Sequence, residues 1–436
     1  MRVHQIHAVV APLTLLLAAC GSGGGGVQPT GEDMGLNKGA GPYQRYFVQS
    51  PDSAGRDVRT RWPVLLSHAW SRNADTSFQG DEPHPINEFE RYGVKKALEA
   101  EGVIVYQPDK LAFASHERRG QLLYKKCAGE TIEEILCEGA NPQVIDGVHT
   151  ATLDYCGRAE LRARNGFVDE QSCREGLQFN IICHSQGCPD SRYMMAAVRN
   201  AFSGELMYRH VASWTSMAGA NKGTAQADAV QELLLACTQP GCRSLVLDAA
   251  FGLASLFQNQ ALILQGGESV VALTRKYMMV TTDMKCEPSS ETRCPPSFND
   301  RYPLPQDPSH PVLYQSFTSQ IDNINHPCYR DSRVYWEIVR DREGPNDGNI
   351  SVDSQRFTTY GPGEAGGATP VIPRWVSATS NDPMQPHPGL DHMAFSSSEV
   401  PGMAGVSCLG EDNSAFEFSR IRLYRDIVAE LANWGY

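Results

Sequence analysis

The chain has 436 residues, of which 41% are hydrophobic and 20% are charged. This composition is typical of one large globular domain or two average ones, and it excludes disordered and collagen-like chains. Thirty-eight Lys and Arg residues against fifty Asp and Glu residues give a formal net charge of −12. Such a chain has no excess of positive charge that would attract nucleic acid or anionic lipid, so we expect no nucleic-acid partner.

Residues 1–19 have the pattern of an export signal. Arg2 precedes an apolar run from Ala8 to Ala19, which is too short for a bilayer span of about 20 residues. Cys20 and a Gly-rich stretch follow, and this order resembles the lipobox and tether of bacterial lipoproteins, in which the Cys is lipidated. We therefore expect a signal peptide over 1–19, and lipidated Cys20 with a flexible tether over 20–45. The protein would be anchored to a bacterial membrane or the cell surface, with secretion after ordinary signal cleavage as the alternative.

Cysteine usage agrees with export. Thirteen cysteines are present, and the twelve that remain after Cys20 form an even set, which favours disulfides formed outside the cytosol. Cys237 and Cys242 surround a Pro-Gly turn, so we predict a small disulfide loop there rather than half of a zinc site. For Cys183 and Cys188, buried thiols are the alternative to pairing.

Short apolar runs alternate with helical patterns from Tyr46 onward. Runs of this kind predict strands buried on both faces, separated by helices such as 89–101 and 190–202, so the predicted fold class is α/β with a mostly parallel sheet. We expect one domain over 46–436, with Cys-rich and helical insertions at about 115–175 and 222–296. The predicted strands are Trp62–Leu66, Gly102–Tyr106, Phe179–Cys183, Val211–Thr215 and Val334–Val339.

The strongest local motif follows the predicted strand Phe179–Cys183. A strand that enters a tight turn centred on a Ser, and then a helix, is the context of a nucleophile elbow of the form G-x-S-x-G. Ser185 would be the nucleophile, and Gly187 provides the small residue that lets the helix approach the sheet. Cys183 occupies the position where the motif usually has its first Gly.

The segment Asn180–Gly187, continued by Asp190–Met194, resembles the elbow of secreted bacterial lipases of the Pseudomonas and Burkholderia type, in the α/β-hydrolase superfamily. Order and spacing match over most of residues 60–400, although insertions interrupt the match. The resemblance implies an α/β-hydrolase fold, an ester or lipid substrate, and a dedicated folding chaperone as a partner. Further matching segments are Pro63–Trp70, Arg119–Leu123, Val211–Ser213, Phe298-Asn299, Tyr302-Pro303 and Asn346–Gly348.

In this fold the acid follows the nucleophile in the chain and the His comes last. We expect the acid to leave the end of a late strand, Arg333–Arg340, in the turn Gly344–Gly348, because a turn Asp can face inward there. Asp347 matches the Asn-Asp-Gly acid of the lipases. Asp353 is the reserve candidate.

Two histidines, His387 and His392, lie beyond the acid turn. His392 precedes an apolar segment, as a loop His before a covering helix should, so it is the expected base. His387 stands between two prolines and is the alternative. A tetrahedral oxyanion needs two backbone N–H donors, for which we expect Gln186 and, by the lipase resemblance, Trp70.

The related lipases often carry a structural calcium, held by a carboxylate shortly after the catalytic His. Ala394 occupies that position, so we expect no metal, and Asp391 would serve only if His387 were the base. We expect no cofactor. Apolar helical patterns within 222–296 predict either a mobile lid or a permanently packed cap.

These residues together predict a serine hydrolase that cleaves carboxylic esters, of the lipase or esterase kind, through a Ser185–Asp347–His392 triad and an acyl-enzyme. A triad determines acyl transfer without choosing the acyl group, so an extracellular polyester depolymerase of the polyhydroxyalkanoate type is an alternative. A non-catalytic surface lipoprotein with a hydrolase fold is a further alternative, against which the presence of all three residues argues.

Overall fold

The structure is a computed structural model, and the ranges it describes exclude the predicted signal peptide and Cys20. For residues 44–47, 240, 248–251, 260–265, 377, 379–380 and 416–417 only the backbone is described. The described residues are 44–47, 57–69, 78, 93–108, 110–124, 147–251, 260–279, 296–326, 329, 333–357, 371–377, 379–380, 389–396, 416–417 and 420–436.

A seven-stranded sheet with the order β1-β7-β6-β5-β4-β2-β3 forms the centre of the fold. Each neighbouring pair in it is parallel, so the carboxyl ends of the strands meet at one edge. A short antiparallel pair, β8 (Thr379–Ser380) with β9 (Phe416–Glu417), lies apart from it. The strands are β1 (Gln44–Phe47), β2 (Val64–Ser67), β3 (Val105–Tyr106), β4 (Phe179–His184), β5 (Val211–Met217), β6 (Leu313–Thr318) and β7 (Val371–Ser377).

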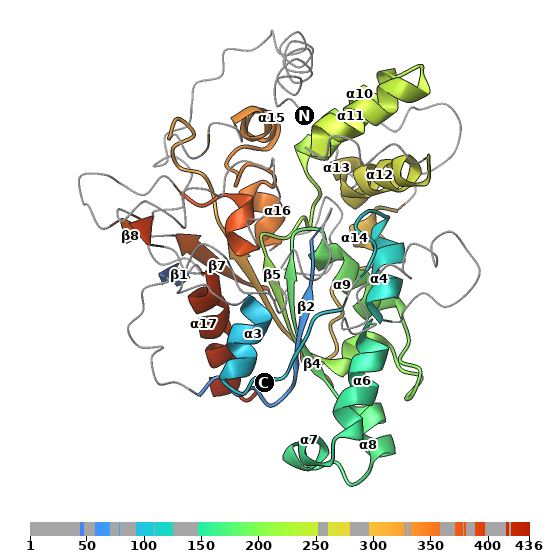
Figure 1. The fold of residues 1–436 in the computed structure, drawn as a ribbon, viewed down its shortest axis with the longest axis vertical. Helices are drawn as coiled ribbons and strands as arrows, with labels where there is room; N and C mark the ends of the chain where they lie inside the picture. The colour runs from blue at the N-terminus through green and yellow to red at the C-terminus, as the bar shows by residue number, and fades with distance from the viewer. Residues whose placement is uncertain are drawn as a thin grey trace, which may run out of the picture.

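Helices cover both faces of the sheet (Figure 1). Successive strand side chains point to opposite faces: Leu65 and Ile181 join the core beneath one helical layer, whereas Leu66 and Ile182 join the core beneath the other. This arrangement confirms the predicted α/β class. The first layer contains α4 (His116–Tyr124), α6 (Gly147–Gly157) and α9 (Gly187–Ala197), and the second contains α3 (Val94–Ala100) and α17 (Arg420–Asn433).

Helix α17 shows why its sequence folds onto the sheet. Leu423, Ile427 and Leu431 are spaced four residues apart and are fully buried, so they form one apolar stripe along the helix. Burying each such side chain contributes about 1.5–3 kcal/mol. The stripe therefore fixes the C-terminal helix against the face on which Leu66 lies.

The segment Arg333–Glu343 is a helix, α15, and not the strand that the sequence predicts at Arg333–Arg340. Its apolar run is as short as a strand, and periodicity alone does not separate a short strand from one face of a helix. Val339 is the only residue of α15 that is buried, and Arg333 pairs with Glu337 one helical turn away at 2.9 Å. The segment therefore packs as a surface helix, with Val339 buried and Trp336 partly buried against Ile321 and Tyr329.

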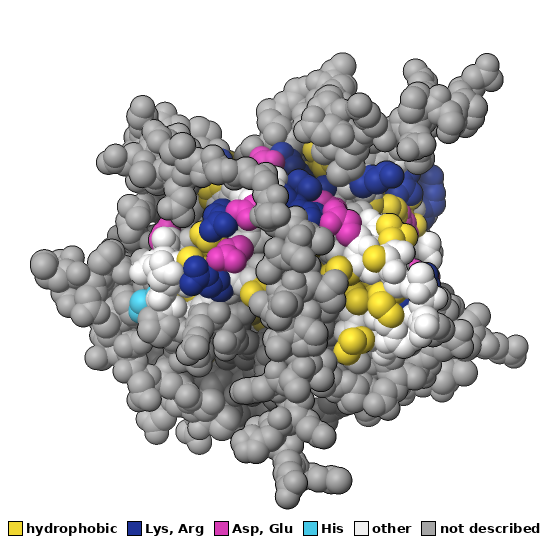
Figure 2. Space-filling model, turned by 90° about the horizontal axis from the view of Figure 1, so that it is seen from above, with side chains coloured by type: hydrophobic (Ala, Val, Ile, Leu, Met, Phe, Trp, Pro, Cys, Tyr) yellow, Lys and Arg dark blue, Asp and Glu magenta, His cyan; other side chains and the backbone are white. Residues whose placement is uncertain are grey.

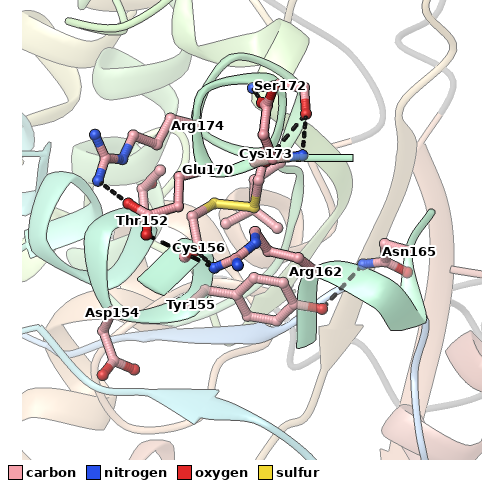
Figure 3. Close-up of a disulfide and its surroundings, with 12 residues drawn as sticks. Thr152, Asp154, Tyr155, Cys156, Arg162, Asn165, Glu170, Ser172, Cys173 and Arg174 are labelled. Carbon is pink, nitrogen blue, oxygen red and sulfur yellow. Dashed lines mark hydrogen bonds and ion pairs between the residues drawn. A yellow bond between two sulfur atoms is a disulfide. The ribbon is translucent and has the colours of Figure 1, made fainter. Parts of the chain in front are cut away.

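The Cys-rich segment at 115–175 combines core and peripheral structure. Helices α4 and α6 contribute to the core, whereas α7 (Ala159–Arg164) and α8 (Glu170–Gly176) project beyond the sheet (Figure 1). A buried disulfide between Cys156 and Cys173 ties α6 to α8 (Figure 3). The bond therefore compensates for the limited core beneath the projecting helices.

Within the predicted insertion at 222–296, the described residues 222–251 and 260–279 form a cap above the carboxyl edge of the sheet (Figure 1). Val230, Leu247 and Val270 pack with Phe113 into a small separate core, and the predicted Cys237–Cys242 disulfide is formed. Figure 2 shows the face on this side, where basic and acidic side chains lie next to one another beside a group of hydrophobic ones. The cap helices are α10 (Ala225–Ala236), α11 (Pro240–Phe251), α12 (Gln260–Leu273) and α13 (Arg275–Met278).

The remaining helical elements are short. They are η3 (Met207–His210), α14 (Phe298–Arg301), α16 (Val352–Arg356) and η6 (His392–Phe395). Among the described residues, no helix has both the length and the apolar character needed to cross a membrane.

Replacing both cysteines of the α6–α8 bond with Ala should lower the free energy of unfolding by about 3 kcal/mol, because the bond closes a loop of 17 residues in the unfolded chain. Urea denaturation measures the change. The matched control is Cys237→Ala/Cys242→Ala, whose bond spans only 5 residues and should cost less to remove. Equal unfolding free energies for the parent and the Cys156→Ala/Cys173→Ala variant would contradict the expectation.

Candidate active site

Ser185 lies in the turn between β4 and α9 with a backbone φ of +54°. This left-handed conformation costs a residue with a side chain about 1–2 kcal/mol, so the surrounding structure must impose it. The Ser185 N–H donates to the Met217 carbonyl at 3.1 Å, and the Ser185 carbonyl accepts from the Ala220 N–H at 3.3 Å. The last residue of β5 and the loop that follows it thus hold the turn through both its N–H and its carbonyl group.

Gly187 allows α9 to begin immediately after this turn. A Cβ atom at position 187 would lie 2.4 Å from the Ser67 carbonyl oxygen and 2.7 Å from that of His68. Contacts this short exclude every larger residue unless the backbone moves. The helix therefore approaches the carboxyl end of β2 closely, and this close approach requires the small residue expected at position 187.

The predicted nucleophile, base and acid come together in one hydrogen-bonded chain. Ser185 Oγ lies 2.8 Å from His392 Nε2, and His392 Nδ1 lies 2.7 Å from Asp347 Oδ2. Because an ionised carboxylate only accepts hydrogen bonds, Nδ1 carries the proton and Nε2 is left to accept from the Ser185 hydroxyl. All three side chains are buried, with Ser185 the most exposed at 7%.

The acid turn is attached to the end of β6, not to the end of a strand at 333–340. Ile321, just after β6, donates its N–H to the Asn346 carbonyl at 2.9 Å. Asp347 Oδ1 accepts from the Ile350 N–H at 2.8 Å, which leaves Oδ2 directed at the base. The reserve candidate Asp353 lies elsewhere, with 69% of its side chain exposed and paired with Lys222 at 3.0 Å.

His392 is held through its backbone as well as its ring. Its N–H donates to the Asp347 carbonyl at 2.8 Å, and the ring of His184 lies 4.8 Å from its ring between centroids. His184 Nε2 is 3.1 Å from the His392 carbonyl, so His184 supports the base rather than taking part in the triad. The alternative base His387 lies outside the described residues.

Of the two expected oxyanion donors, Gln186 is described and Trp70 is not. Gln186 is the first residue after the nucleophile and is fully buried. Its side-chain Nε2 donates to the Ala114 carbonyl at 3.1 Å, and its Oε1 accepts from Ser269 Oγ of α12 at 3.3 Å. The residue that carries the expected donor is therefore fixed by contacts on two sides.

The sequence did not predict a buried cluster of charged side chains around Asp190, in the first turn of α9. Asp190 of α9 contacts Lys110 and Arg119 at 2.7 Å each and His116 at 3.1 Å, and all four side chains are fully buried. Burial alone would raise the pKa of Asp190, but the charges of Arg119 and Lys110 outweigh it and keep that pKa below its usual range. Arg119 also donates to the Ala69 carbonyl at 3.0 Å, so the cluster ties α9 to the loop that leads to position 70.

Asp391, beside the base, carries a second buried carboxyl group. Its Oδ1 accepts from the Ala394 N–H at 3.0 Å as the N-cap of η6. Burial, together with the negative charge of Asp347, raises the pKa of Asp391 to about 8. The described residues contain no group of three or more His, Cys, Asp or Glu side chains placed to hold a metal ion.

The α/β-hydrolase fold is defined by a parallel sheet and by a left-handed Ser between an inner strand, here β4, and the next helix. An acid and a His that come later in the chain meet this Ser at the same edge of the sheet. The chain has this fold. Its solved structural neighbours include EstA from Clostridium botulinum, with 14% identity, a TM-score of 0.44, and coverage of 97% of this chain and 98% of that one.

Two further neighbours are a metagenomic carboxyl esterase and lipase 1 from Pelosinus fermentans. The esterase has 13% identity and a TM-score of 0.43, covering 86% of this chain and 76% of that one. The lipase has 13% identity and a TM-score of 0.38, covering 86% of this chain and 99% of that one. No family model and no curated protein matches the sequence.

Asp391→Asn should stabilise the protein increasingly as the pH rises. Folded Asp391 keeps its proton up to a pH of about 8, whereas an ordinary Asp loses it near 3.8, so the stability of the parent falls between these values and levels off above them. Asn does not titrate and can still cap η6. Between pH 5 and pH 9, the unfolding free energy of the variant relative to the parent should rise by at least about 1.4 kcal/mol, the equivalent of one pKa unit. A difference that is constant with pH in urea denaturation would contradict this.

Proposed function

We propose that the protein is a serine hydrolase that cleaves carboxylic esters through an acyl-enzyme. The observation that carries the proposal is the chain of two short hydrogen bonds, 2.8 Å from Ser185 Oγ to His392 Nε2 and 2.7 Å from His392 Nδ1 to Asp347 Oδ2. A hydroxyl, an imidazole and a carboxylate in this order form the arrangement that activates a Ser for acyl transfer. Its presence argues against a purely binding role.

In the first half-reaction, Ser185 Oγ attacks the ester carbonyl carbon while His392 Nε2 takes the hydroxyl proton. Asp347 stabilises the resulting imidazolium through the Nδ1 proton, and His392 then gives the Nε2 proton to the leaving alcohol. Water repeats the cycle on the acyl-enzyme and releases the acid. The developing oxyanion would accept from the Gln186 backbone N–H, one of the two donors that the reaction needs.

The cap supports a lipase-like substrate preference. Leu235, Leu245 and Val271, on three successive cap helices, are 75%, 48% and 41% exposed, and this exposed apolar surface on the cap is the feature that motivates the preference for a lipid substrate. The C-terminal half of α12 is anchored, because His116 Nε2 lies 2.8 Å from the Ala272 carbonyl and Ser269 contacts the elbow residue Gln186. We favour a cap whose base stays fixed over a lid that swings as a unit.

Ser185→Ala should abolish ester hydrolysis and leave the melting temperature nearly unchanged, because the hydroxyl contributes reactivity rather than packing. His392→Ala should lower kcat by several orders of magnitude. The assay measures turnover of p-nitrophenyl esters of increasing chain length, an emulsified triglyceride and an insoluble polyester, so that it also separates a lipase from an esterase and from a polyester depolymerase.

The matched control for the base is His387→Ala, which should change kcat only modestly. A fluorophosphonate probe should label the parent at Ser185 and leave Ser185→Ala unlabelled. Labelling of another residue, or collapse of activity in His387→Ala with survival in His392→Ala, would reassign the site.

We propose also that the mature protein is a lipid-anchored protein outside the cytosol. The lipobox-like sequence ending at Cys20 motivates the anchor. Three disulfides, Cys156–Cys173, Cys183–Cys188 and Cys237–Cys242, occur among the described cysteines, and such bonds support an oxidising compartment. The dedicated folding chaperone remains an expectation of the lipase resemblance.

Cys20→Ser should move the protein from the membrane fraction to the soluble exported fraction of a bacterial host. The several acyl chains of a bacterial lipoprotein hold it firmly, whereas the unmodified N-terminus has no such anchor. Membrane fractionation with immunoblotting measures the shift, and Cys237→Ser serves as the control. Unchanged membrane association of Cys20→Ser would show that Cys20 is not the anchor.

A further inference from the structure

The Cys183–Cys188 disulfide encloses the nucleophile. Cys183 is the next-to-last residue of β4 and Cys188 is the second residue of α9, so the bond closes a ring around Ser185 with only 5 residues of separation. Both cysteines are fully buried. The sequence allows either a disulfide or two buried thiols at these positions. In the structure the two cysteines form a disulfide.

This bond lies where an elbow usually has no side chain at all. The first Gly of G-x-S-x-G is replaced by Cys183, and its sulfur occupies the space between the end of the strand and the start of the helix together with that of Cys188. Unbonded atoms need a separation of about 3.5–4 Å, and a covalent bond allows the two cysteines to approach more closely than that. The bond is therefore what makes two sulfur atoms compatible with this position.

Contacts on several sides hold the first turn of α9 in place. Gly187 lies against the Ser67 carbonyl, and Ser67 Oγ donates to the Gly187 carbonyl at 3.0 Å. Asp190, less than one helical turn further, is held by the buried charges of Lys110 and Arg119. A sulfur that lost its bond would consequently displace the turn at Ser185 rather than the helix.

We propose that Cys183 and Cys188 are positioning residues: their covalent bond substitutes for the missing glycine and places Ser185 Oγ in line with His392. The inference rests on the proposed function, since the position of Oγ matters only if Ser185 is the nucleophile. It assigns to this disulfide a role in kcat that differs from the stabilising role of the α6–α8 disulfide.

The test compares two variants that both lack the bond. Cys188→Ala leaves the Cys183 sulfur unbonded in the elbow, whereas Cys183→Gly/Cys188→Ala removes both sulfurs and restores the usual glycine. We expect Cys188→Ala to lower kcat for a soluble short-chain ester, and the rate of fluorophosphonate labelling, about tenfold with little change in KM, because a misplacement of 1 Å can cost about 100-fold. The double variant should return to within about threefold of the parent.

The melting temperature separates positioning from simple stabilisation. Both variants lose the same bond and should melt at similarly lowered temperatures, while their kcat values differ. Cys183→Ala leaves the other sulfur unbonded and should behave as Cys188→Ala does, which provides a second single-sulfur variant if the first folds poorly. Cys156→Ala/Cys173→Ala is the control, with a lowered melting temperature and unchanged kcat.

Two outcomes would overturn the inference. Parent-like kcat in both single-sulfur variants would show that the bond does not position Ser185, and equally slow turnover in the single and double variants would show that only general stability is lost. A parent protein with neither ester hydrolysis nor labelling at Ser185 would instead refute the proposed function, so the two failures are distinguishable.

Discussion

The left-handed backbone at Ser185 is the constraint on which the site depends. A residue with a side chain does not adopt φ of +54° by preference. The elements around Ser185 must therefore stabilise this backbone conformation. The end of β5 and the loop after it each supply one backbone hydrogen bond, and Gly187 lacks the side chain that would clash with the end of β2. The turn places the Ser185 hydroxyl at the edge of the sheet where Asp347 and His392, which come later in the chain, also lie.

The buried charge cluster around Asp190 holds the opposite side of the elbow. One carboxylate meets Lys110, Arg119 and His116 in a volume without solvent. Removing one partner from a buried ion pair leaves an uncompensated charge, which costs about 3–5 kcal/mol. Its members come from α9, α4 and the loop after β3, so an interaction of this strength couples the nucleophile's helix to the loop in which an oxyanion donor is expected.

Chain order singles out Ser185, Asp347 and His392 from the sequence, because the fold allows few candidates once the elbow is found, and the structure places these three side chains together. The strands β6 and β7 were not predicted, since buried Gln315 and Ser316 interrupt the apolar pattern of β6 and Pro373 and Arg374 interrupt that of β7. In β6 the polar groups bond within the protein, as Gln315 does to Thr215 Oγ1 at 2.9 Å. The Asp190 cluster joins residues as far as 80 positions apart. Local sequence spacing does not predict a contact over such a separation.

Because the acid turn is attached to the end of β6, the chain between them forms a loop whose two ends lie side by side. Ile321 and Asn346 meet through a backbone hydrogen bond, so residues 322–345, including α15, leave the sheet and return to the point of departure. Loop closure entropy grows only slowly with length, and the carboxylate is oriented by Ile350 on the far side of the turn. The Trp336 carbonyl of α15 accepts a hydrogen bond from the Asn346 side chain at 3.2 Å, and buried Tyr329 donates to the Gly389 carbonyl at 2.6 Å. The segment therefore supports the acid turn, and only its exposed positions can change without displacing Asp347.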